Sequence, residues 1–160
     1  MRHTLAVLVN NSPGVLARVA GLFSRRGFNI ESIAVGETEE HSVSRMTIVV
    51  TADDVLLEQV TKQLYKLIDV IKISDLTNDP AVEREMALIK VTTTSANRSE
   101  ILQIVDIFRA KIVDVSEKAV IIEVTGGVEK IEAIMSLLRN YGIKEVARTG
   151  KVAMARSVKG

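Results

Sequence analysis

The stretch LAVLVNNSPGVL, residues 5–16, sets an apolar run directly before a polar turn and the start of an apolar repeat. Leu5–Val9 is continuously aliphatic, which is typical of a buried strand. Pro13 and Gly14 end that run, and from Val15 onward the apolar residues recur at helical spacing. The stretch therefore predicts a strand that turns sharply into an amphipathic helix.

The segments that follow extend this order to residue 76. Asp53 and Asp54 offer an N-cap to a second helix, whose last turns carry lysines that suit a helix C-terminus. The hydrophobic pattern predicts strands over Phe28–Val35, Val43–Thr51 and Val70–Leu76, and a helix over Val55–Leu67. The order is strand, helix, strand, strand, helix, strand.

The same order recurs in the second half of the chain. Strands are predicted over Met86–Val91, Ile112–Val115, Ala119–Val124 and Ile143–Ala147, helices over Ser99–Phe108 and Val128–Arg139, and an added edge strand over Val152–Ala155. A doubled order of this kind predicts an α+β protein of two tandem ferredoxin-like βαββαβ domains. We expect the domains at residues 1–77 and 85–160, joined by a linker at 78–84 that carries the second proline.

A ferredoxin-like unit covers only one face of its sheet with helices, yet Thr47–Val50 is apolar on successive positions. Both faces of the sheet are therefore expected to be covered. A homodimer that joins two sheets would supply that cover.

Composition excludes several classes of function. Aromatic residues make up 3% of the chain and the net charge is +1, so neither a base-stacking platform nor a broad attraction to nucleic acid or anionic membrane is expected. The absence of cysteine removes disulfides and thiolate chemistry. The chain has no signal-peptide pattern and no apolar stretch long enough to span a bilayer, which predicts a cytoplasmic protein with no membrane partner.

The turn at residues 10–16 is the strongest candidate for a binding site. Unpaired N–H groups and the dipole at the helix N-terminus attract a small anion such as a carboxylate. The amide oxygens of Asn11 and Asn29 could accept from an ammonium group, so the pair of features fits a free α-amino acid. A purely structural interpretation remains open, with Ser12 as N-cap and Pro13 as the first helical residue.

Other polar residues give no clear site. His3 and His41 are isolated and are interpreted as surface residues, and Glu37, Glu39 and Glu40 as a solvated loop. The tail from Lys144 is basic and could either contact an acidic partner or act as a solubilising segment. No metal cluster and no catalytic constellation is expected.

The segment HTLAVLVNNSPGVLARVAGLFSRRGFNIESIAVG, residues 3–36, resembles an ACT domain, a ligand-binding module of amino-acid metabolism. Together with SRMTIVV, LEQVTKQLYKLIDVIKISDL and VEREMALIKV, it is similar to the small regulatory subunits of acetohydroxyacid (acetolactate) synthase. The later segments EILQIVDIFRAKIVDVS, IIEVTGG and YGIKEVARTGKVAMAR agree, so the resemblance covers nearly the whole chain.

The resemblance implies a homodimer that binds a catalytic large subunit, raises its activity and confers feedback inhibition by valine or a related branched-chain amino acid. No cofactor is expected in this chain, whereas thiamine diphosphate, Mg²⁺ and FAD are expected on the catalytic subunit. The family's effector-site asparagines and glycine match Asn11, Asn29 and Gly14, and its small-residue position falls at Val35–Gly36, where glycine replaces the usual alanine. The expected effector-binding residues are Asn11, Gly14, Val15, Leu16, Asn29, Ile30, Val35 and Gly36.

Two other functions compete with this interpretation. A stand-alone ACT-domain sensor would have the same pocket but another partner, and co-purification with a thiamine-dependent large subunit would separate the two. A small enzyme of ferredoxin-like fold would need an acid–base pair, which the sequence does not offer. A turnover assay of the isolated chain would distinguish it.

Overall fold

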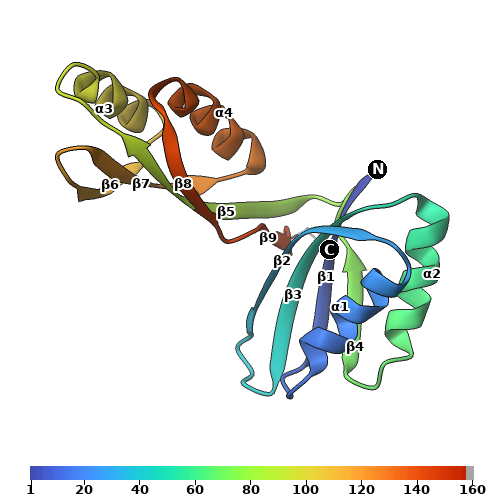
Figure 1. Ribbon diagram of the computed structural model, residues 1–160. Helices are drawn as coiled ribbons and strands as arrows, with labels where there is room; N and C mark the ends of the chain where they lie inside the picture. The colour runs from blue at the N-terminus through green and yellow to red at the C-terminus, as the bar shows by residue number, and fades with distance from the viewer. Residues whose placement is uncertain (158–160) are drawn as a thin grey trace. The chain divides into compact units, whose positions relative to one another are not determined.

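The computed structural model describes residues 1–157 and divides into two compact units. The first unit comprises residues 1–82 together with the described residues from Lys151 onward, and the second comprises residues 83–150. Each unit is an antiparallel sheet with two helices (Figure 1). The predicted α+β fold of two ferredoxin-like units is confirmed.

The sheet of the first unit has the strand order β2-β3-β1-β4. Helices α1 and α2 lie against one of its faces (Figure 1). The first unit contains β1 (Arg2–Asn10), α1 (Val15–Arg25), β2 (Asn29–Glu37), β3 (Val43–Thr51), α2 (Asp54–Tyr65), β4 (Val70–Asp75) and, from the tail, β9 (Val152–Ala155). The predicted cap of α2 is present, since Asp53 accepts a hydrogen bond from the Leu56 N–H at 2.8 Å.

Strand periodicity separates the two faces of this sheet. Leu5, Val7 and Val9 of β1 point toward the helices and form the core with Val19 and Phe23 of α1. Because side chains alternate along a strand, the intervening residues of β1 face the opposite side.

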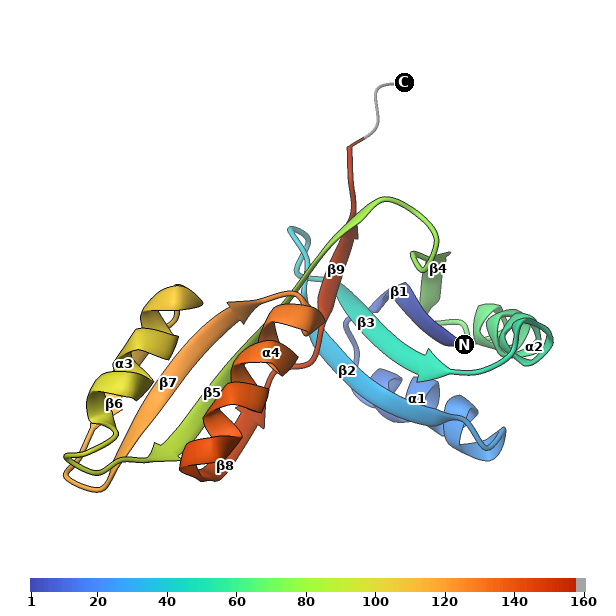
Figure 2. The same cartoon turned by 90° about the horizontal axis from the view of Figure 1, so that it is seen from above.

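The second unit repeats the topology with strand order β6-β7-β5-β8. Helices α3 and α4 lie on one face of the sheet (Figure 2), over a core that includes Ile89, Ile122 and Ile131. Its elements are β5 (Ala81–Thr92), α3 (Arg98–Ile107), β6 (Lys111–Val115), β7 (Ala119–Gly126), α4 (Val128–Leu138), the 3₁₀ turn η1 (Arg139–Tyr141) and β8 (Ile143–Arg148).

The tail belongs to a different unit from the one expected. We predicted a second domain over residues 85–160, but the described residues from Lys151 group with the first unit. Ala153 packs against Ala6 and Leu76, and the Arg156 N–H donates to the carbonyl oxygen of Pro80 at 2.9 Å. The expected linker also differs, because β5 begins at Ala81 and pairs with β9.

These tail contacts lie on the sheet face opposite the helices, which was expected to be covered by a second copy of the chain. Ala6 is buried there by Ala153, while Thr47 and Val49 on β3 are only 2% and 4% exposed in the single chain. A second copy of the chain is therefore not needed to bury these positions, contrary to the argument from hydrophobicity.

The prediction that His3 lies on the surface is wrong, because its side chain is 3% exposed. Its Nε2 lies 3.5 Å from a carboxylate oxygen of Asp54, and its Nδ1 lies 3.4 Å from one of Asp75. A second neighbour of Nδ1 is the Thr77 hydroxyl, also at 3.4 Å. Position near a terminus suggested exposure, but β1 is a central strand, and residues at the start of α2 and the end of β4 enclose the ring.

Candidate functional site

The turn between β1 and α1 is shaped by Gly14. This residue is the N-cap of α1 and has φ 83° and ψ −6°, the left-handed region that favours glycine. No side chain caps the helix, and α1 begins at Val15. The structural interpretation with Ser12 as N-cap and Pro13 as first helical residue is therefore wrong.

The N-terminus of α1 presents backbone donors. Arg18 supplies the first N–H that bonds inside the helix, to the Gly14 carbonyl oxygen at 3.0 Å. The Val15 N–H reaches back to the Ser12 carbonyl oxygen at 3.4 Å, the outer limit of hydrogen bonding. With no acidic residue in the first turn, the helix dipole there is left for an incoming anion.

Arg18 is a functional candidate that the sequence analysis missed. Its guanidinium lies over the glycine, since a Cβ built on Gly14 would be 2.9 Å from Arg18 Nη1. Arg18 Nη2 also donates to Asp69 at 2.5 Å, which fixes the group in place. Spacing could have revealed it, because residues i and i+4 share one helix face. The cation adds to the attraction of this turn for a carboxylate.

Asn11 is held in a defined orientation beside the turn. Its Nδ2 donates to Glu37 Oε1 at 3.2 Å and to the His41 carbonyl oxygen at 2.9 Å. Both amide hydrogens are therefore engaged, and Oδ1 remains as an acceptor for a ligand ammonium. Glu37 was predicted as part of a solvated loop; instead it ends β2 and contacts both Asn11 and His41.

Apolar side chains flank these polar groups. Leu16 of α1 and Val35 of β2 are each 46% exposed. Among residues 1–157, nothing lies within 4 Å of a Cβ built on Gly36, and this position faces the side of the sheet opposite Val35. Val15 is buried in the core and can offer only its backbone. The arrangement suits an aliphatic ligand side chain.

Asn29 and Ile30 lie at the other end of β2. Asn29 pairs with Thr51, whereas Glu37, beside Asn11, pairs with Ser44. The length of β2 separates Asn29 from Glu37, roughly 26 Å at about 3.3 Å per residue. In a single chain the Asn11–Glu37 hydrogen bond places the β1–α1 turn beside the Val35–Gly36 end of β2, whereas Asn29 and Ile30 lie at the other end of that strand.

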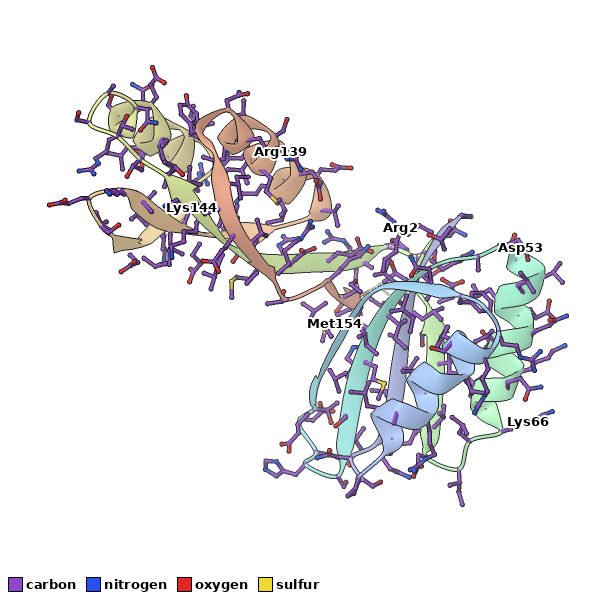
Figure 3. All side chains as sticks on the ribbon, viewed as in Figure 1. Arg2, Asp53, Lys66, Arg139, Lys144 and Met154 are labelled. Atoms are coloured by element: carbon purple, nitrogen blue, oxygen red, sulfur yellow. The ribbon has the colours of Figure 1, made fainter. Side chains whose placement is uncertain are left out.

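A hollow of about 560 Å³ lies elsewhere in the first unit. It is lined by Arg26, Gln59, Lys62, Gln63, Tyr65 and Lys66, of which Lys66 is labelled in Figure 3. Within residues 1–157 no group of three or more His, Asp or Glu side chains is placed to hold a metal ion. Among the same residues, no helix is both long and apolar enough to cross a membrane.

The first unit thus has the βαββαβ fold of an ACT domain, with backbone donors at the N-terminus of its first helix. Residues 5–72 match the family model described as the AHAS small subunit-like ACT domain, and residues 84–157 match the model for the small subunit of acetolactate synthase. The chain belongs to the acetolactate synthase small-subunit family.

Individual relatives agree over almost the full length. The chain is 61% identical to a probable acetolactate synthase small subunit of Archaeoglobus fulgidus, over 99% of each chain. It is 56% identical to the acetolactate synthase small subunit of Mycolicibacterium smegmatis, over 99% of this chain and 93% of that one. The crystal structure of the small subunit from Thermotoga maritima superimposes with a TM-score of 0.91 at 49% identity, over 99% of each chain.

Proposed function

We propose that this chain is the non-catalytic subunit that makes acetolactate synthase responsive to a branched-chain amino acid, with valine as the effector. It raises the activity of the catalytic subunit and confers feedback inhibition on it. The observation that carries the proposal is the Asn11 amide beside the donors of α1. Its nitrogen is fixed by Glu37 and the His41 carbonyl, and its oxygen has no hydrogen-bond partner among residues 1–157. The amide oxygen and the helix donors match the ammonium and carboxylate of a free amino acid.

The carboxylate would bind at Gly14, where the Val15 and Leu16 N–H groups and the Arg18 guanidinium converge. The ammonium would take Asn11 Oδ1, close to the negative charge of Glu37. Leu16 and Val35 would contact the aliphatic side chain of the effector.

A homodimer would bring the distant end of β2 into the same site. β2 is an edge strand of the sheet, and a two-fold axis at its middle would pair it antiparallel with its own copy. With the axis at Ile33, Asn29 of one protomer faces Glu37 of its partner. Asn29 and Ile30 would then complete the corner formed by Asn11 and Gly14 of the other chain.

Effector binding at such an interface would act by shifting the balance between two arrangements of the dimer. The size of the shift is limited by the difference in valine affinity between them, about 1–3 kcal/mol for typical allosteric coupling. The catalytic subunit, which would carry thiamine diphosphate, Mg²⁺ and FAD, responds to that balance.

Reconstitution tests the proposal directly. The chain alone should form no acetolactate, and adding it should raise the turnover of the matching catalytic subunit and make that turnover sensitive to valine. Co-purification with the catalytic subunit separates this function from a stand-alone amino-acid sensor. A catalytic subunit whose rate and valine response are the same with and without the chain would contradict the proposal.

A further inference from the structure

The sheet of the first unit has two edge strands, β2 and β4, and they differ in what meets their outer backbone groups. In β4, the Ile73 N–H donates to the Tyr65 hydroxyl oxygen at 3.1 Å, and that hydroxyl donates to the Ile73 carbonyl oxygen at 3.2 Å. Tyr65 is the last residue of α2 and not part of the sheet, so both backbone groups of Ile73 point away from β1. One side chain therefore occupies the outer edge of β4 at this residue.

These two hydrogen bonds have the form of a contact between strands. In an antiparallel ladder, the two residues of a hydrogen-bonded pair exchange both of their N–H···O bonds. The Tyr65 hydroxyl gives Ile73 an acceptor and a donor at once, so it takes the place that a residue of an added strand would occupy. The turn at residues 66–69 returns the chain from α2 to β4, so this block is built into the connection between the two elements.

Without this block, β4 would be suited to strand addition. Val70, Ile71 and Ile73 are β-branched, a residue type that favours strands, and Ile71 is 49% exposed. The other edge is free: within residues 1–157, side-chain hydrogen bonds reach the Glu31 and Glu37 side chains of β2 but none of its backbone groups. The sheet therefore has one blocked edge and one free edge.

The two edges differ in what pairing along them would produce. Pairing of β2 with β2 about a two-fold axis uses the same strand of both copies, so the assembly closes at two chains. Pairing of β2 with β4 uses different strands and leaves an unpaired edge at each end, where further copies can add. A block on β4 therefore decides whether this sheet forms a closed dimer or a growing polymer.

We propose that the Tyr65 hydroxyl blocks strand addition at β4 by a second copy of this chain, and so confines pairing along this sheet to β2. Association through the first unit then ends at the dimer. This inference rests on the proposed function, because the pairing of β2 with its own copy is the homodimer proposed there.

Sedimentation velocity of the full chain over a range of concentrations tests the block. Tyr65 is 52% exposed and lies outside the core, so Tyr65→Ser removes the ring and both hydrogen bonds without opening a cavity. Its weight-average mass should grow with concentration to at least about twice that of the unchanged chain, because each added copy brings another unpaired edge. Tyr65→Phe keeps the ring but frees both backbone groups of Ile73, and it should associate in the same way to a smaller extent.

Asp53→Ala is the matched control, because it weakens the same helix at its other end. It removes the N-cap that accepts from the Leu56 N–H and leaves β4 untouched, so the mass should stay that of the unchanged chain. Adding Ile71→Lys to Tyr65→Ser places a charge on the exposed edge of β4, which should reverse the association.

Three results would overturn the proposal. The first is a mass for Tyr65→Ser no greater than that of Asp53→Ala, and the second is a Tyr65→Phe chain that behaves as the unchanged chain does. The third is growth that Ile71→Lys does not reduce, because it would come from general destabilisation and not from β4. An unchanged chain that sediments as a monomer would contradict the homodimer of the proposed function, and the difference between Tyr65→Ser and the unchanged chain would still decide the role of Tyr65.

Discussion

The two units share one topology and differ in the turn that precedes the first helix. In the first unit the turn is capped by a left-handed glycine, and the Asn11 amide extends to the end of β2. In the second unit, the equivalent turn closes on itself: the Thr94 N–H donates to Asn97 Oδ1 at 2.8 Å, and the Asn97 N–H donates to the Thr94 hydroxyl at 3.2 Å. An amide oxygen that satisfies its own turn is not left to accept from a ligand.

The two units also differ at the sheet face that the helices do not cover. The first unit buries Ala6 there beneath the tail. The second unit carries an exposed ion pair, with Lys90 Nζ 3.4 Å from Glu145. A shared fold therefore fixes neither the site nor the cover of the sheet, and both depend on a few residues in turns and at chain ends.

Gly14→Asp should have the largest effect on this comparison, because it converts the binding turn into a closed one. The new carboxylate would occupy the anion position and pair with Arg18, whose Nη1 lies 2.9 Å from the point where a Cβ at position 14 would stand. We expect valine affinity to fall by at least about a hundredfold, or about 2.7 kcal/mol. The measurement is the valine dose response of the reconstituted enzyme.

Gly14→Ala is the matched control, because it introduces the same left-handed strain without the charge. Either substitution should cost about 1 kcal/mol of stability at φ 83°. If alanine abolishes the valine response as fully as aspartate does, backbone strain is responsible and the anion position is not at this turn.

Arg148→Met should have an effect of similar size, on the stability of the second unit. Arg148 bonds to Glu85, which is 6% exposed, and to Glu132 at 2.9 Å. The hydrogen bond to Glu85 raises the pKa of Arg148, with Glu132 adding to the effect, so the guanidinium stays charged. Removing it leaves the Glu85 carboxylate buried without this partner, at a cost of about 3 kcal/mol.

Chemical denaturation of the full chain measures that cost. Lys90→Met removes an exposed ion pair from the same unit and should cost less than about 0.5 kcal/mol. Equal losses in the two variants would show that burial of Glu85 is not what makes the Arg148 contact important.

Asn11→Ala should weaken valine binding by about ten- to a hundredfold, the effect of losing a charge-assisted hydrogen bond worth about 1.5–3 kcal/mol. Activation of the catalytic subunit should persist, since Asn11 is exposed and supports no core residue. Titration calorimetry with valine is the measurement, and an affinity equal to that of the unchanged chain would exclude Asn11 from the site.

Most helices and strands could be located from the sequence, because burial of one face repeats apolar residues at the spacing of a helix or a strand. Val43–Thr51 and Val152–Ala155 were predicted with the bounds that the structure shows, and Asp53 as an N-cap. The features that the sequence did not reveal depend on contacts between distant residues. His3 is buried by residues of α2 and β4, and Ala153 docks on β1, at the opposite end of the sequence.

Only part of the candidate site could be predicted, because only part of it is local in sequence. Asn11 and Gly14 belong to one turn, so their proximity follows from local sequence. Arg18 was missed because it lies beyond the turn, on the helix. Its i+4 spacing from Gly14 would have indicated that the two residues share one face of the helix. The separation of Asn29 from Asn11 follows from the antiparallel register of β2, which becomes clear only once the sheet order is known.

Asn97→Ala should have the smallest effect on valine binding, and it gives the sharpest comparison of the turns before α1 and α3. It is the second unit's counterpart of Asn11→Ala, but its amide oxygen serves the turn before α3. Losing that turn should cost about 1 kcal/mol of stability, as for other helix-entry residues. It should leave valine affinity unchanged, because the side chain faces its own backbone.

Thermal unfolding and valine titration of the two variants, measured side by side, should therefore give opposite patterns. Asn11→Ala should lose affinity with little destabilisation, and Asn97→Ala should lose stability with intact affinity. A weakened valine response in Asn97→Ala would mean that the second turn also takes part in effector binding, and the contrast between the two turns would no longer explain where the site lies.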